Sequence, residues 1–256
     1  MTTALVTGAS VGIGAQFALQ LAQAGHDLVL VARDEARLEA FADELTAAYP
    51  GISTEVLAAD LADREATQRV CDRLADEARP VDILVNNAGF GLKAAFLDSD
   101  IGDEETGLDV MVRAVMLTCH AAGRAMRARG SGQIINVSSI AGFIASGTYS
   151  AEKAFVTVFT EGLATQLQGT GVTATAVCPG FTHTEFHERA RLRMDWLPEW
   201  AWLTAEQVAR EGLADAAAGK VISIPGRQWK AVSVVARTAP RPIVRSPRVA
   251  MRHRRR

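Results

Sequence analysis

Short apolar runs alternate along the chain with longer stretches in which apolar residues recur at helical spacing. The short runs are typical of buried strands, and the longer stretches are typical of amphipathic helices. We expect strands at 4–6, 28–32, 54–58, 83–85, 133–137, 172–177 and 221–224. The expected helices are 12–24, a charged one that ends near 48, 63–77, 104–129, 149–168 and 205–218.

The predicted strands are apolar on both faces, and helices separate them along the chain. Strands of this kind belong to parallel sheets that helices cover on both sides. The pattern predicts a doubly wound α/β protein, a Rossmann fold of about seven strands. We expect one domain over residues 1–225, which includes a substrate lid at 181–203, and a basic C-terminal tail at 226–256.

Composition narrows the class of protein. The chain has 256 residues, of which 48% are hydrophobic and 22% are charged, as in globular proteins that dissolve in water. No apolar run approaches the roughly 20 residues that a membrane-spanning helix needs. The N-terminus leads directly into an apolar strand, without the charged region or the cleavage site of a secretion signal, so we expect a cytoplasmic protein.

Metal binding and disulfide bonds are not expected. Cys71, Cys119 and Cys178 are scattered and lack metal-ligand spacing, so we interpret them as buried apolar residues in a reducing compartment. The histidines and glutamates near residue 185 have a spacing that could suit metal ligands, but such pairs are common on solvated helix surfaces, so we do not expect a metal site there. They are His183, Glu185, His187 and Glu188.

Charge is distributed unevenly along the chain. All 29 acidic residues lie at or before Asp215, whereas eleven of the 27 lysines and arginines lie beyond it. A basic tail on an acidic body predicts a partner. Apolar residues among the basic ones, such as Trp229 and Val234, suit peripheral contact with an anionic membrane. Pairing with the acidic body of another subunit and disorder of the chain end are the alternatives. We expect no nucleic acid, because no stacking aromatics stand among the terminal arginines.

A glycine-rich loop directly follows the first predicted strand. It runs Thr7-Gly8-Ala9-Ser10-Val11-Gly12-Ile13-Gly14 and leads into the first helix. Glycines let the backbone turn tightly and approach a pyrophosphate, which then lies at the positive N-terminus of the helix. Because strand, loop and helix occur together, the loop predicts a dinucleotide site. The expected contacts are Gly8, Ser10, Gly12, Ile13 and Gly14.

The choice of cofactor depends on the end of the second predicted strand. NAD-binding proteins usually place a carboxylate there, which binds the ribose hydroxyls. That position is Ala32 here, and Arg33 follows it. A guanidinium can form two hydrogen bonds with a 2′-phosphate, and Arg37 stands one turn further on. We therefore expect NADP(H); a solvated arginine at a helix start is the alternative.

Tyr149 and Lys153 form a candidate catalytic pair, because their spacing places both side chains on one face of a helix. A tyrosine phenol titrates near pH 10, which is too high for proton transfer at neutral pH. A lysine ammonium one turn away favours the phenolate and lowers that pKa. The position of the pair, after a strand that ends in Ser138 and Ser139, makes it more specific than a chance pair on a helix surface.

These motifs, in this order, resemble the short-chain dehydrogenase/reductase family, which carries TGxxxGxG, NNAG and YxxxK motifs. The resemblance extends from Thr3 to about Ile224. It implies that Tyr149 is the general acid and base, that Ser139 orients a substrate carbonyl, and that Lys153 also holds the nicotinamide ribose. It further implies cofactor contacts where later strands end. These are Asp60, Leu61, Asn87, Ala88, Gly89, Pro179, Gly180, Thr182 and Thr184.

Two features depart from the family pattern. Met111 occupies the place where many members carry an asparagine that braces a proton-relay water, and a thioether cannot donate a hydrogen bond. The spacing from Ser139 to Tyr149 is also shorter than usual, which predicts a tighter loop and leaves Ser138 as a substitute for Ser139.

The expected lid is rich in large apolar side chains, which predicts a lipophilic substrate such as a 3-oxoacyl chain, a steroid or a terpenoid ketone. These side chains are Phe186, Met194, Trp196, Leu197, Trp200 and Trp202. Packing of the lid onto its own domain or onto a neighbouring subunit is the alternative interpretation.

The leading hypothesis is an NADPH-dependent oxidoreductase that reduces a carbonyl to an alcohol, or catalyses the reverse, through Ser139, Tyr149 and Lys153. A non-catalytic NADP(H)-binding sensor or scaffold is the alternative, and Met111 is its main support. The intact serine, tyrosine and lysine argue against it. We expect a homo-oligomer, either a dimer or a tetramer.

Overall fold

The fold is built around one sheet of seven parallel strands, as the strand pattern predicts. The computed structural model describes residues 2–92, 94–184 and 198–240. The strand order of the main sheet is β3-β2-β1-β4-β5-β6-β9. Its strands are β1 Thr3–Thr7, β2 Asp27–Ala32, β3 Thr54–Ala58, β4 Ile83–Asn86, β5 Gly132–Val137, β6 Val172–Val177 and β9 Ile222–Ser223. Because β1 pairs with both β2 and β4, the strand order reverses there, and folds of this type bind ligands beyond the carboxyl ends of such strands.

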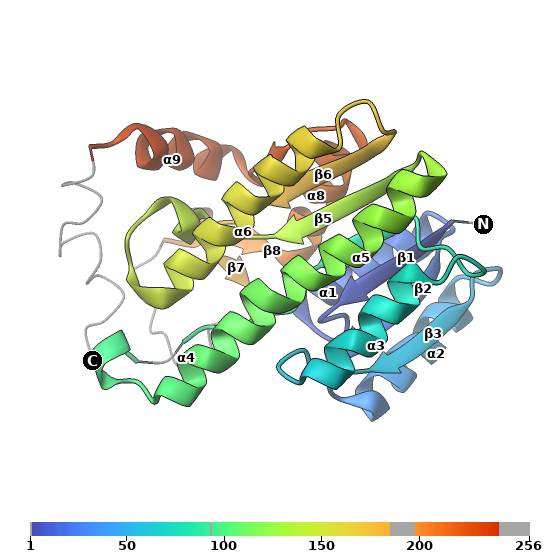
Figure 1. Cartoon of the computed structure of the whole chain (residues 1–256). Coiled ribbons are helices and arrows are strands. Elements are labelled where there is room, and N and C mark those ends of the chain that lie inside the picture. The colour runs from blue at the N-terminus through green and yellow to red at the C-terminus, as the bar shows by residue number, and fades with distance from the viewer. Residues whose placement is uncertain (1, 93, 185–197, 241–256) are drawn as a thin grey trace.

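Helices cover both faces of the sheet (Figure 1). One face carries α1, α2 and α8, and the other carries α3, α5 and α6. The helices are α1 Gly12–Gln23, α2 Glu35–Ala48, α3 Arg64–Ala75, α4 Ile101–Leu108, α5 Ala114–Arg129, α6 Gly147–Gln166, α8 Ala205–Ala217 and α9 Arg227–Thr238. None of these described helices is both long enough and apolar enough to cross a membrane.

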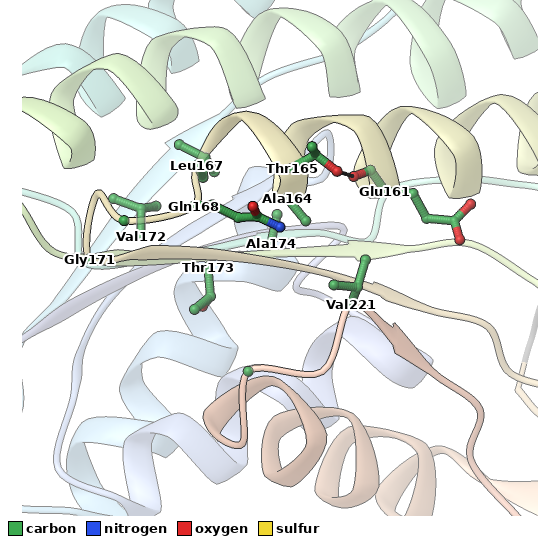
Figure 2. Close-up of a pocket in the computed structure, with 12 residues that line it drawn as sticks. Glu161, Ala164, Thr165, Leu167, Gln168, Gly171, Val172, Thr173, Ala174 and Val221 are labelled. Atoms are coloured by element: carbon green, nitrogen blue, oxygen red, sulfur yellow. Dashed lines mark hydrogen bonds between the residues drawn. The ribbon is translucent and has the colours of Figure 1, made fainter.

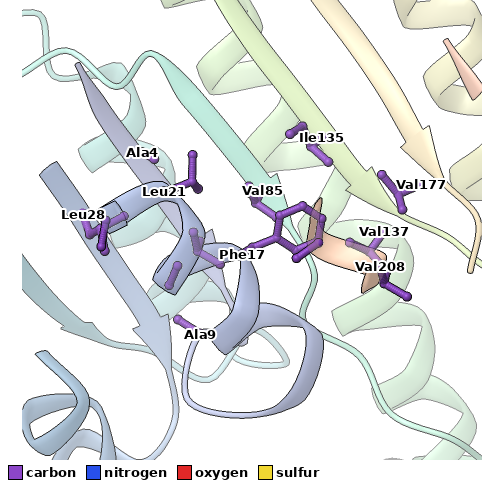
Figure 3. Packing of buried hydrophobic residues seen from close by; sticks show 14 of the residues in the cluster. Ala4, Ala9, Phe17, Leu21, Leu28, Val85, Ile135, Val137, Val177 and Val208 are labelled. Carbon is purple, nitrogen blue, oxygen red and sulfur yellow. The ribbon is translucent and has the colours of Figure 1, made fainter. Parts of the chain in front are cut away.

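Apolar side chains fill the space between the sheet and each helix layer. Phe17 of α1 is fully buried and packs against valines of the sheet and of α8, among them Val177 and Val208 (Figure 3). Burying an aromatic side chain of this size stabilises a fold by about 1.5–3 kcal/mol. Cys71, Cys119 and Cys178 are all free and buried, which confirms their interpretation as core residues.

The long helix expected at 104–129 is a composite in the structure. It begins as α4, continues through one π-helical turn, η2 Asp109–Arg113, and ends as α5. The backbone N–H of Ala114 bonds to the carbonyl of Asp109, which gives the wider spacing of a π turn. Such turns occur frequently at functional sites, and this one contains Met111.

The segment expected as a basic tail begins with α9, which packs on the domain. Trp229 is 8% exposed, and its indole Nε1 donates to the carbonyl of Ala201 at 2.9 Å. Figure 1 shows α9 at the end of the molecule away from α2 and β3. The described residues of the chain therefore remain packed well past the expected boundary at residue 225.

Candidate functional site

The glycine-rich loop turns back on itself at the carboxyl end of β1. The backbone N–H groups of Gly8 and Ala9 donate to the carbonyl of Val31 at the end of β2. A β-carbon on Gly8 would lie 2.8 Å from Nδ2 of Asn87, and one on Gly14 would collide with the Gly8 carbonyl. A side chain at either position would clash with the loop itself or with Asn87, so the tight turn of the loop requires glycine at both. The loop thus fits the pyrophosphate cradle that its sequence predicts.

The N-terminus of α1 faces this loop. The helix begins at Gly12; Val11 before it provides no side-chain cap, and no acidic residue stands in the first turn. Backbone N–H groups without a side-chain acceptor and the positive end of the helix dipole favour an anion. Ser10 and Ile13, both partly buried, lie on either side of the start of α1.

Thr7 joins the glycine-rich loop to the segment after β4, a role that motif matching did not assign to it. Its Oγ1 accepts from the backbone N–H groups of Asn87 at 3.0 Å and Ala88 at 3.1 Å. In return, Nδ2 of Asn87 donates to the carbonyls of Thr7 at 3.0 Å and Gly8 at 3.3 Å. The two predicted cofactor motifs therefore form one bonded unit.

The predicted adenosine contacts follow β2 and β3. Arg33 is exposed directly after β2, while the carboxylate of Asp34 accepts from the backbone of Arg37 and caps α2. Asp60 is also exposed and accepts from the backbone of Ala62, whereas the buried Leu61 belongs to the core. Asp63, and not Asp60, caps α3, since its carboxylate accepts from the backbone N–H of Ala66.

The segment after β6 returns to the glycine-rich loop. Pro179 and Gly180 end the strand, and Oγ1 of the buried Thr182 donates to the carbonyl of Gly180 at 3.0 Å. A β-carbon on Gly12 would lie 3.2 Å from Cγ2 of Thr184. The predicted nicotinamide contacts and the predicted pyrophosphate contacts thus lie close together.

Tyr149 and Lys153 meet on α6, as their spacing predicts. The Lys153 Nζ lies 5.8 Å from the centroid of the Tyr149 ring and donates to the Val137 carbonyl at 3.0 Å. Burial raises the pKa of the Tyr149 phenol above its ordinary value, and a hydrogen bond with the side chain of Ser139 opposes that change only in part, so the lowered pKa expected from Lys153 is not found in the structure. A β-carbon on Gly89 would lie 3.6 Å from this same Nζ. The structure therefore brings the Ser139, Tyr149 and Lys153 set together beside a predicted cofactor contact.

Ser138 and Ser139 have different surroundings. The buried Ser138 donates its hydroxyl hydrogen bond to the Lys153 carbonyl at 2.7 Å and also contacts the Thr157 hydroxyl at 2.7 Å. The partly buried Ser139 is the serine that bonds to Tyr149. The geometry thus favours Ser139 as the substrate-facing residue and gives Ser138 a structural role.

Glu152 is a buried carboxyl group that the sequence did not single out. It is 1% exposed, and neither of its oxygens has a hydrogen-bond partner among the described residues. Burial raises its pKa to about 7, against the lowering effect of Lys153. Burial in turn lowers the pKa of Lys153 to about 8, and the Glu152 charge opposes that change. Two groups that titrate near neutral pH thus stand next to each other in the candidate site.

Met111 lies close to Lys153, the candidate catalytic lysine, and both side chains approach Gly89. It is fully buried, and its Sδ would be 3.3 Å from a β-carbon on Gly89. Behind it, Nδ2 of Asn86 donates to Asn136 and Oγ1 of Thr118 donates to Asn86, both at 2.9 Å. Sequence reasoning missed this amide network, because it joins three elements through contacts that no local motif records.

The lid is described only in part. Phe186, Met194, Trp196 and Leu197 lie outside the described residues, as do Glu185, His187 and Glu188 of the histidine and glutamate group near residue 185. Of the described side chains, Phe181 packs against Trp202 and Trp229, at centroid distances of 5.9 Å and 5.4 Å. His183 stacks on Trp202 and bonds to Glu199. Phe181 thus packs the described end of the lid onto Trp229 of α9.

A hollow of about 660 Å³ lies away from the candidate site. It is lined by the end of α6 and the beginning of β6, with Leu167, Val172 and Val221 on its wall (Figure 2). The candidate site lies at the opposite, carboxyl end of β6. None of the predicted site residues lines the hollow.

Comparison with known proteins agrees with this geometry. The sequence model of the family described as short chain dehydrogenase matches residues 2–195. The chain is 40% identical over 187 residues to sulfoacetaldehyde reductase 2 of Chromohalobacter salexigens, covering 71% of this chain and 73% of that one. It is 32% identical to a galactitol 2-dehydrogenase (L-tagatose-forming) of Cereibacter sphaeroides, covering 91% and 92%.

Solved structures agree as well. A short-chain dehydrogenase from Sphingobium yanoikuyae in complex with NADPH has a TM-score of 0.84 and 33% identity, covering 92% of this chain and 93% of that one. A short-chain dehydrogenase/reductase from Burkholderia phymatum in complex with NAD has a TM-score of 0.79 and 26% identity, covering 91% and 92%.

Proposed function

Because the chain belongs to the short-chain dehydrogenase family and is an oxidoreductase of alcohol and carbonyl groups that uses a nicotinamide cofactor, we propose that it is an NADPH-dependent carbonyl reductase. The proposal rests on one observation: Ser139, Tyr149 and Lys153 converge beside Gly89 at the carboxyl end of the sheet. A sensor or scaffold would have no need of this set.

In the proposed reaction the nicotinamide ring supplies the hydride to the carbonyl carbon. Ser139 holds the carbonyl oxygen, and Tyr149 gives that oxygen a proton. The ammonium of Lys153 favours the phenolate that remains, and it holds the nicotinamide ribose. In the reverse direction Tyr149 removes the proton from the alcohol.

The preference for NADPH is supported by the end of β2. Ala32 stands where a ribose-binding carboxylate is usual, and the next carboxylate, Asp34, is occupied in capping α2. The exposed Arg33 follows the strand whose Val31 carbonyl holds the glycine-rich loop. A guanidinium at this place suits a 2′-phosphate.

The proposed substrate is a lipophilic ketone or 3-oxoacyl compound. Its support is the apolar composition of the expected lid at 181–203; the described Phe181 and Trp202 pack against each other, and Phe181 also packs against Trp229 of α9. The experiment is NADPH oxidation with a panel of aliphatic, steroid and acyl-thioester ketones beside small polar aldehydes. Turnover restricted to polar aldehydes would overturn the substrate class, and cofactor binding without turnover of any carbonyl would favour the sensor alternative.

We also propose that the protein is a homo-oligomer. Met116 of α5 and Phe155 and Val158 of α6 are exposed by 44%, 36% and 67%, and the segment before α5 packs against α6. An apolar face of this kind suits a second copy of the chain. Light scattering should give the mass of an oligomer for the unmodified protein and a lower mass for the Val158→Glu variant. A monomer mass for the unmodified protein would contradict this proposal.

A further inference from the structure

The outer face of α9 carries apolar side chains that nothing described covers. Val234 and Val235 are 61% and 66% exposed, although the opposite side of the helix is fixed to the domain by Trp229. Helical spacing places Ala231, Val234 and Val235 together on the side that faces away from Trp229. The helix therefore has one apolar contact with its own domain and a second apolar face directed outward.

Trp200 extends this outer face from a distant part of the sequence. Its side chain is 71% exposed, and its carbonyl accepts from the amide of Gln228 at 3.3 Å, which places it beside the first turn of α9. Exposed tryptophan is typical of the boundary between a lipid bilayer and water, where its apolar ring and its polar N–H are both accommodated.

Positive charge surrounds the same face. Arg227 and Lys230 are exposed on α9, Arg237 has its guanidinium over the Phe143 ring at 5.6 Å, and no acidic residue occurs after Asp215. Glu211 lies 4.0 Å from Lys230 and offsets part of this charge, and Glu199 bonds to His183. Residues 241–256 add seven arginines to the sequence directly after the helix.

We propose that α9 and Trp200 attach the protein peripherally to an anionic lipid bilayer, with the valine face in the headgroup region and the basic residues on the lipid phosphates. Neither feature is sufficient alone, because stable peripheral binding takes an apolar insertion together with a polybasic segment. Here both features occur on one element.

A second copy of the chain is a poorer occupant of this face. A twofold contact would bring each α9 against its equivalent and set basic residues against basic residues, and Glu211 beside Lys230 would offset only part of that repulsion. An anionic bilayer offers the apolar depth and the negative charge together. The inference is independent of the proposed reaction, because Val234 and Val235 lie outside the candidate site.

The test is sedimentation of the full-length protein with vesicles of phosphatidylcholine alone or mixed with phosphatidylglycerol. We expect binding to the mixed vesicles only, weakened by salt, and lowered about tenfold in Val234→Ser/Val235→Ser. Leu97→Ser, which changes a residue that is 91% exposed elsewhere on the surface, should bind like the unmodified protein.

Absence of binding to either vesicle would overturn the proposal, and so would equal binding of the Val234→Ser/Val235→Ser variant. Light scattering on the same variants distinguishes a second copy: a lower mass in the double variant, with no vesicle binding by the unmodified protein, would assign the face to self-association. The rate of NADPH oxidation by Val234→Ser/Val235→Ser should equal that of the unmodified protein. A loss of vesicle binding can therefore be distinguished from a loss of the proposed reaction.

Discussion

The hydroxyl of Ser138 bonds to the main-chain carbonyl of Lys153 at 2.7 Å and thereby ties the end of β5 to the catalytic helix. Its neighbour Ser139 bonds to Tyr149 instead. The two adjacent serines thus have different partners at this strand end, and we propose that Ser138 positions α6 whereas Ser139 binds the substrate carbonyl.

The two serines should therefore fail differently when each is replaced by alanine. Ser139→Ala should lose about 10²-fold or more in kcat, because a donor to the carbonyl oxygen is gone, and about 1 kcal/mol of stability, because its oxygen also accepts from the backbone N–H of Ala141 at 3.1 Å. Ser138→Ala should lose about 1–2 kcal/mol of stability and keep most of its turnover. Urea denaturation and steady-state kinetics on both variants check this, and interchanged effects would contradict the assignment.

Buried Glu152 should make stability depend on pH. Its pKa in the fold, about 7, lies above its ordinary value of 4.5, so the fold favours the protonated form. The stabilisation is complete below about pH 4.5 and is lost as pH rises to about 7, by up to about 3 kcal/mol. Lys153 titrates above this window, because its pKa is about 8.

Glu152→Gln should remove this fall of stability between about pH 4.5 and pH 7. Above about pH 7 the variant should be more stable than the unmodified protein. Denaturant unfolding at several pH values measures it. Glu105→Gln, an exposed change on α4, serves as the control and should leave the slope in place. An unchanged slope in Glu152→Gln would mean that other groups cause it.

The amide network behind the site should contribute to stability rather than to chemistry. Thr118→Val removes the donor to Asn86 from a fully buried position, which should cost about 1–3 kcal/mol. Thr165→Val changes a threonine whose hydroxyl bonds only to the backbone of its own helix, at an exposed site, and should cost much less. If urea denaturation gave the same loss of unfolding free energy for both variants, the buried network would contribute no more to stability than an exposed hydroxyl.

Much of this arrangement could be predicted from local patterns. The seven strands follow from short apolar runs, and the site residues follow from motifs at the strand ends, because parallel strands collect their carboxyl ends at one edge. The packing of α9 could not be predicted in this way. Its arginines and the prolines after it indicate a tail, and only the fit of Trp229 against Gly180 and Ala201 shows why the helix stays on the domain.

Glu152 and the π turn at Met111 escaped prediction for a related reason. An acidic residue beside a lysine on a helix is ordinarily solvated, and its burial here depends on Gly107 of α4, whose missing side chain leaves room for the carboxylate. The π turn depends on how α4 meets α6, which is a tertiary property. Sequence patterns record neither contact.

Cofactor preference should depend on Arg33. Arg33→Ala should weaken NADPH binding about 10- to 100-fold, the loss expected for charge-assisted hydrogen bonds to a 2′-phosphate, and leave NADH binding nearly unchanged. Calorimetric titration with both cofactors measures it. Arg210→Ala on α8, an exposed arginine paired only within its helix, is the matched control. Equal weakening for both cofactors would refute the assignment.

Proton transfer by Tyr149 can be tested by replacing each of the chain's two tyrosines with phenylalanine. Tyr149→Phe should still bind NADPH and should lose about 10²- to 10⁴-fold in kcat on any carbonyl that the unmodified protein reduces. Tyr49→Phe, at the end of α2, should keep both binding and turnover. Turnover by Tyr149→Phe at the rate of the unmodified protein would contradict the account.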